Sequence, residues 1–196
     1  MIINVQISVG DPTPSEIWAV MSQFQGIPKK TYLHSGDTFP TMKELQDNNK
    51  QILLFKHNGV NCDDVTSSGC TGRILEFHKY ALETEYSFSG PEAIEIYPNS
   101  CVGTRGLGST KDFYHINHFV TKSIGASKNS AEQINQKEVL ESRIKECEKV
   151  TNLVTSMVSV DFWQEGDLLE VAQEINKNRA KKRRSLRKRV LDWLHE

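Results

Sequence analysis

One carboxylate stands where α/β proteins commonly place catalytic groups. The segment 156–160, SMVSV, is short, apolar and rich in β-branched residues, which predicts a buried strand. Asp161 follows it directly, and Gly166 and Asp167 then open an amphipathic helix. An acid at the carboxyl end of such a strand lies at the edge where parallel sheets bind ligands. The same position also suits an Asx turn or a helix cap, so both interpretations stay open.

Several cationic residues could contact an anionic ligand. Lys56 and His57 end the apolar strand predicted over 50–59, where a cation suits a phosphate or an anionic headgroup. A solvated strand end would show the same residues. Arg105 lies between glycines in VGTRGLGST, which suits an anion contact, although these glycines do not have the spacing of a phosphate-binding loop.

Two histidines close in sequence raise the question of a metal site. His115 and His118 lie three residues apart on the predicted strand 112–121, which places them on opposite faces. They cannot hold one ion together without a bulge, and we expect His118 to make a structural hydrogen bond. No other pattern in the chain indicates a metal or a cofactor, so none is predicted.

Cysteine spacing leaves the redox state open. The four cysteines form no CxxC pair, which argues against a zinc ribbon or a thioredoxin-like site. Cys62 and Cys70 bracket a Gly/Ser/Asp-rich loop that could close as a disulfide. Four free thiols, with Cys101 and Cys147 unpaired as well, are the alternative.

The charge is divided unevenly along the chain. Of the 24 Lys and Arg residues, nine lie in 177–189, which leaves residues 1–176 with 15 basic and 23 acidic side chains. The tail 177–196 therefore suits an anionic membrane surface; a solvated helix and, with less support, a nucleic-acid contact are the alternatives. The first residues have no basic stretch or cleavage site of a signal peptide, and no apolar run reaches a membrane span, so a cytoplasmic location is expected if Met1 is the natural start.

The elements that must position these residues alternate between strand and helix. Thr13, followed by Pro14, and Thr41, with Glu44 at the spacing of a capping box, predict two helix starts. Strands are predicted at 2–9, 50–59, 81–88, 112–121 and 156–160, and a long helix at 129–150. About five short, apolar strands alternating with helices predict an α/β fold with a parallel sheet. A full (β/α)₈ barrel needs eight strands and about 250 residues, so these would form an incomplete TIM-like barrel over 1–176 or else a small open sheet.

Six motifs occur in order along residues 1–176. They are FPTMKELQDNNKQILLF, LETEYSF, NSCVGTRG, HINHFV, AEQIN with a late helical Cys147, and VDFWQEGDLLEVAQEIN. In this order they resemble the C-terminal half of the phosphatidylinositol-specific phospholipase C X-domain-like phosphodiesterases. The resemblance implies a distorted TIM-like barrel that cleaves phosphodiesters with two histidines as general base and acid, helped by an arginine or calcium.

The resemblance also assigns roles to particular residues. Asp161 matches the last-strand aspartate that orients the general-base histidine. Tyr86 matches a strand whose side chains contact inositol, with Thr84 on the same face, although Leu82 and Glu85 replace the family's Trp and Pro. Packing beneath a loop would explain Tyr86 equally well.

The family's two catalytic histidines and its arginine belong to strands that the matched part does not include. We therefore expect a phospholipase C-like phosphoric diester hydrolase whose 196-residue chain turns over negligibly, with a phosphoinositide-like or other phosphodiester lipid as substrate. The alternative is a non-catalytic half-barrel that associates through exposed sheet edges and uses its basic tail at a membrane surface.

Overall fold

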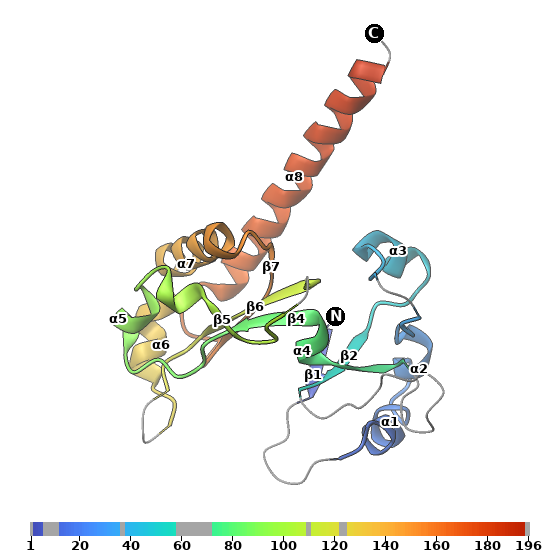
Figure 1. Cartoon of the computed structure of the whole chain (residues 1–196), viewed down its shortest axis with the longest axis horizontal. Coiled ribbons are helices and arrows are strands. Elements are labelled where there is room, and N and C mark those ends of the chain that lie inside the picture. Colours follow the sequence, from blue (N-terminus) through green and yellow to red (C-terminus); the bar gives the residue numbers. More distant parts are fainter. Residues whose placement is uncertain are drawn as a thin grey trace. The chain divides into compact units, whose positions relative to one another are not determined.

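The computed structural model describes residues 2–5, 12–35, 38–57, 72–108, 111–121 and 125–194 (Figure 1). The chain folds into two compact units. The first unit comprises Met1–Glu83 and Thr104–Tyr114, and the second comprises Thr84–Gly103 and His115–Glu196. Each is described by itself below.

A parallel sheet organises the first unit. Its strands are β1 (Ile2–Val5), β2 (Leu53–Lys56) and β3 (Ile74–Glu76), in the order β1-β2-β3. The helices α1 (Pro14–Met21), α2 (Ile27–Lys30) and α3 (Met42–Asp47) lie between β1 and β2 in the chain. Ile17 of α1 packs with Ile52, Leu54 and Ile74, which is the burial expected when helices alternate with strands.

Both predicted helix starts are present, and each has a capping box, which the sequence predicted for Thr41 and Glu44 only. The Thr13 hydroxyl accepts from Glu16 N, and the Glu16 carboxylate accepts from Thr13 N at 2.7 Å. Thr41 and Glu44 repeat this exchange at the start of α3. These reciprocal bonds satisfy donors that a helix N-terminus leaves unpaired, which is why the spacing predicts these helix starts correctly.

The strands differ from the prediction in number. After β3 come the helical turn α4 (Phe77–Tyr80) and the strands β4 (Ala81–Thr84), β5 (Gly103–Arg105), β6 (Phe113–His118) and β7 (Thr155–Val160). These last four form a second sheet in the order β5-β4-β6-β7. The described residues thus contain seven strands in two sheets instead of about five in one, and they form no closed barrel. β3 and β5 were not predicted, because each has only three residues and is too short to show a periodic pattern.

The single helix predicted over 129–150 is two helices, α6 (Lys128–Ile134) and α7 (Lys137–Thr151). The break falls at Asn135, which is fully buried. Its side-chain amide donates to Asp161 O at 3.0 Å, and its own carbonyl accepts from Asp167 N at 2.8 Å. Because that carbonyl bonds the turn after β7, it is not used to continue a helix.

The interior of the second unit packs the short helices α5 (Pro91–Ile94) and η1 (Asn99–Cys101) with α6 and α7. The disulfide Cys101–Cys147 joins η1 to α7, so the expectation of four free thiols is wrong for this pair. Cys62 and Cys70 lie outside the described residues.

The chain ends in one long helix, α8 (Leu168–Leu194), which runs unbroken across the predicted boundary at 176/177 (Figure 1). Residues 177–194 are thus helical and continuous with the preceding turns of α8. Within the described part of the chain, no helix is long and apolar enough to span a membrane.

Candidate functional site

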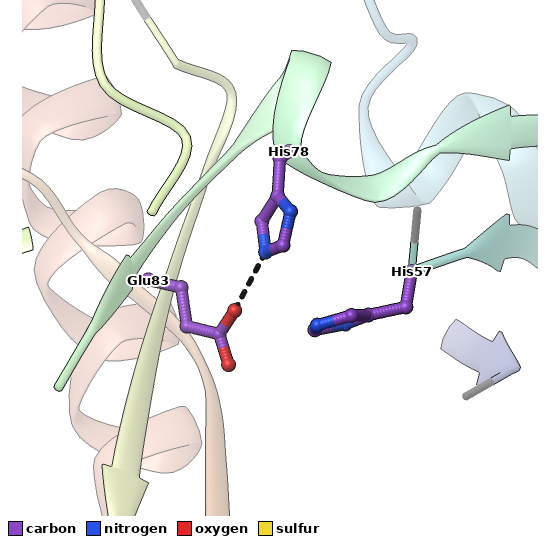
Figure 2. Close-up of side chains that lie close together, drawn as sticks. All are labelled: His57, His78 and Glu83. Carbon is purple, nitrogen blue, oxygen red and sulfur yellow. Dashed lines mark hydrogen bonds and ion pairs between the residues drawn. The ribbon is translucent and has the colours of Figure 1, made fainter. Parts of the chain in front are cut away.

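Four polar side chains meet in the first unit, and we call them the polar cluster: His57, His78, Glu83 and Arg105. His57 follows the last residue of β2, His78 belongs to α4, Glu83 to β4 and Arg105 to β5. His78 and Glu83 face each other in Figure 2, and His57 points toward the same carboxylate. The cluster therefore draws on the ends of several strands, where α/β proteins place binding groups.

Glu83 is the centre of the polar cluster. It is only 2% exposed, and each of its carboxylate oxygens has a partner. Oε2 accepts from His78 Nε2 and Oε1 accepts from Arg105 Nη2, both at 2.7 Å. A buried carboxylate is costly unless it is paired and hydrogen-bonded, so these two partners make the position of Glu83 possible.

The hydrogen-bond partners fix the protons on both imidazoles. Arg105 Nη1 lies 3.0 Å from His57 Nε2. A guanidinium only donates, so His57 accepts at Nε2 and its imidazole is neutral there. A carboxylate accepts, so His78 carries a proton on the Nε2 that faces Glu83. The polar cluster thus holds one imidazole whose Nε2 accepts from Arg105 and one whose Nε2 proton is donated to Glu83.

Local backbone features hold these groups in place. Gly106, next to Arg105, has φ 73°, and a Cβ there would overlap Ala81 O. Glycine is therefore required where β5 ends against β4. Lys111 Nζ donates to His78 O at 2.9 Å and to Lys79 O at 3.0 Å, which satisfies two carbonyls of the short helical turn α4.

Aromatic rings form the surroundings of the polar cluster. The Phe77 ring is fully buried and lies 6.2 Å from the His57 ring at an interplanar angle of 19°. The rings of His57 and His78 are 4.6 Å apart. Phe55 also packs against Phe77. An apolar wall of this kind lowers the local dielectric and strengthens the charged contacts beside it.

Two of the sequence-predicted substrate residues lie in the first unit. Arg105 is a member of the polar cluster. Lys56 is the last residue of β2, is 5% exposed and directly precedes His57. The solvated strand end considered for Lys56 and His57 therefore does not apply, because both side chains are buried.

The other predicted site residues lie in the second unit. The Thr84 hydroxyl is buried and accepts from Asn117 N at 2.9 Å, so it serves the strand backbone. Tyr86 is 47% exposed and lies beyond the end of β4, so the alternation argument that placed it on the face of Thr84 does not reach it. Among the described residues, none hydrogen-bonds the Asp161 carboxylate, and partial burial raises its pKa above the usual range.

The two histidines of β6 have separate structural partners, as predicted for His118. His118 Nε2 lies 2.9 Å from Ile134 O, and His115 Nε2 lies 2.7 Å from Ser159 Oγ. Neither belongs to the polar cluster. A separate apolar groove of about 230 Å³ lies between α7, β7 and α8 in the second unit and contains no residue of the polar cluster.

Sequence reasoning missed His78 and Glu83. One signal was available for Glu83. In the segment ALET it lies on the same strand face as the buried Ala81, so its side chain is expected to point into the interior. His78 had no comparable signal, because α4 is a single turn between two strands.

In the comparison with protein-family models, the PI-PLC X model matches residues 15–176. The chain belongs to the PI-PLC X family. No curated protein and no solved structure matches it. The family match includes β2, α4, β4 and β5, and thus every residue of the polar cluster. The suspected relationship to the phospholipase C X-domain-like proteins is therefore confirmed, and with it the phospholipase C-like class.

Proposed function

We propose that this member of the PI-PLC X family binds the phosphodiester of a phosphoinositide-type lipid at the polar cluster. The observation that supports this most is the placement of Arg105. Its guanidinium is anchored by buried Glu83, and its side chain is 27% exposed, so Arg105 is partly accessible from solvent. Arginine binds phosphate with geometric fit, and a fixed arginine loses little side-chain entropy when it does so.

The two imidazoles complete a phosphate-binding arrangement. His78 donates its Nε2 proton to Glu83 and so helps to hold the carboxylate that anchors Arg105, and Lys56 directly precedes His57 at the end of β2. The polar cluster holds one guanidinium and two imidazoles around a single carboxylate, and Lys56 adds a cation next to His57 in the chain, a composition that favours an anionic ligand such as phosphate.

We further propose that the 196-residue chain cleaves this phosphodiester poorly. By the resemblance described above, no histidine in it occupies a position of the two proton-transfer histidines. A missing general base or acid costs about 10²–10⁴-fold in rate. Binding without efficient turnover is the expected behaviour.

Calorimetric titration with glycerophosphoinositol in EDTA tests the binding. Arg105→Met should weaken the affinity at least tenfold, since it removes the fixed guanidinium. Arg73→Met is the matched control, because Arg73 packs over the Trp18 ring and is no part of the polar cluster. Equal affinity for the wild type and Arg105→Met would refute the proposal. Rapid, protein-dependent release of inositol phosphate from phosphatidylinositol vesicles would refute the expectation of poor cleavage.

A second candidate function is association with an anionic membrane surface. It is favoured by one observation: the consecutive basic residues 181–184 of α8, KKRR, are all exposed. Each basic residue near an anionic surface contributes about 1 kcal/mol.

A further inference from the structure

The polar cluster has the chemistry of a metal site as well as of an anion site. His57 and His78 each offer a ring nitrogen, and Glu83 offers a carboxylate oxygen, with these ligand atoms all within 4.8 Å of one another. Bonds of about 2.0–2.1 Å in a tetrahedral zinc site place ligand atoms about 3.3 Å apart. Small side-chain rotations would thus bring the three atoms to ligand distance.

We propose that His57, His78 and Glu83 bind a divalent transition metal of the zinc type. Two imidazole nitrogens and one carboxylate oxygen suit zinc better than magnesium or calcium, which prefer oxygen ligands alone. Three protein ligands leave one position for water, as in open zinc sites. This inference is independent of the proposed phosphodiester binding.

The supports of the three ligands favour such a site. His78 belongs to α4 and Glu83 to β4, and His57 directly follows β2, so two of the three ligands lie on regular elements and the third lies next to one (Figure 2). Lys111 restrains the carbonyl of His78. Phe77 packs beside the His57 ring. Groups that orient ligands in this way typically change metal affinity 10–100-fold.

Arg105 opposes the metal. It donates to His57 Nε2, the atom that a metal would use, and it already neutralises Glu83. Metal binding must break the contact between Arg105 and His57. It also brings the metal cation close to the positively charged guanidinium of Arg105. Arg105 can stay on Glu83 Oε1 while the metal takes Oε2. The guanidinium thus lowers the metal affinity but does not block the site.

Because Arg105 opposes metal binding, substitutions of the ligands and of Arg105 should change the metal affinity in opposite directions. The full chain, freed of metal, is titrated with Co²⁺ and followed by its visible absorption, and Zn²⁺ affinity is then measured by competition. We expect one equivalent to bind with a tetrahedral spectrum. His57→Gln and His78→Gln should each weaken binding at least tenfold, whereas Arg105→Met should tighten it several-fold. The proposed phosphodiester binding predicts the reverse effect of Arg105→Met on glycerophosphoinositol in EDTA, so the two proposals fail separately.

Controls keep the result unambiguous. His115→Gln removes a buried imidazole of the second unit whose Nε2 contacts Ser159 and should leave metal affinity unchanged. Circular dichroism confirms that each variant is folded, and hyperfine-shifted imidazole resonances of the Co²⁺-loaded wild type report the ligands without any substitution. The proposal would be overturned by any of three results. These are no metal binding by the folded wild type, unchanged metal affinity in both histidine variants, or weaker metal binding by Arg105→Met.

Discussion

The guanidinium of Arg143 lies 3.3 Å from Nδ1 of His118 in the interior of the second unit. Both side chains are buried, and the other ring nitrogen of His118 donates to Ile134 O. The guanidinium donates, so Nδ1 accepts and the imidazole is neutral. Burial and the Arg143 charge lower the pKa of His118 to about 4.

This contact predicts that stability falls with acidification. The folded state binds fewer protons at His118 than the unfolded state between pH 6.5 and pH 4, so the free energy of unfolding decreases as pH falls through this window. The full loss is on the order of 3 kcal/mol. Urea unfolding at a series of pH values should show it. His118→Gln, which keeps a donor for Ile134 O, should flatten the slope below pH 6.5 and leave a constant difference above it. Parallel curves for the two proteins would contradict the assignment.

Gly106→Ala should disturb the polar cluster. The new Cβ would overlap Ala81 O, and the φ of 73° is unfavourable for alanine. We expect a loss of about 1–3 kcal/mol in unfolding free energy and weaker glycerophosphoinositol binding, because Arg105 must shift. Gly108→Ala is the control: Gly108 has φ 113° but its Cβ would meet no atom within 4 Å. If both variants lose the same stability and affinity, backbone strain alone is responsible and the close approach to β4 is unimportant.

The disulfide between η1 and α7 should stabilise the second unit. Removing a native disulfide from a small domain costs about 2–5 kcal/mol. We expect Cys101→Ala and the double variant with Cys147→Ala to unfold at lower denaturant concentration than the oxidised wild type. Dithiothreitol should lower wild-type stability and leave the double variant unchanged. A wild type in which both thiols become titratable in dithiothreitol without any loss of stability would contradict this expectation.

The exposed basic residues of α8 should bind anionic vesicles. Replacing Lys181, Lys182, Arg183 and Arg184 by glutamine removes four exposed charges, each worth about 1 kcal/mol near the surface. Co-sedimentation with phosphatidylserine-containing vesicles should then fall strongly, and raised salt should reproduce the fall. Neutral phosphatidylcholine vesicles are the control. Equal sedimentation of both proteins would rule out the membrane-surface function.

The parts of the fold that sequence predicts well are those with local causes. The capping boxes at Thr13 and Thr41 and the strands at β6 and β7 depend on neighbouring residues, and the structure has them. The break at Asn135 was not predictable, because its hydrogen bonds reach Asp161 and Asp167 about thirty residues away. Local periodicity cannot report a contact at that distance.

The same distinction explains the candidate site. Arg105 and the Lys56–His57 pair were predicted from their positions at strand ends and in a glycine-rich loop. Their meeting with His78 and Glu83 was not, since it depends on a short strand, a single helical turn and the pairing of non-consecutive strands. Tyr86 shows the opposite error, because the strand predicted over 81–88 extends four residues past the true end of β4 at Thr84.

The unbroken course of α8 has a mechanical consequence. Its 27 residues form a rod of about 40 Å. Lys137 of α7 holds its first turns through Glu170 and Glu174, and Arg179 bonds Glu148 and Thr155 O further along. A pull applied at the basic end would therefore be transmitted along the helix axis to these anchors on α7 and to Thr155, the first residue of β7.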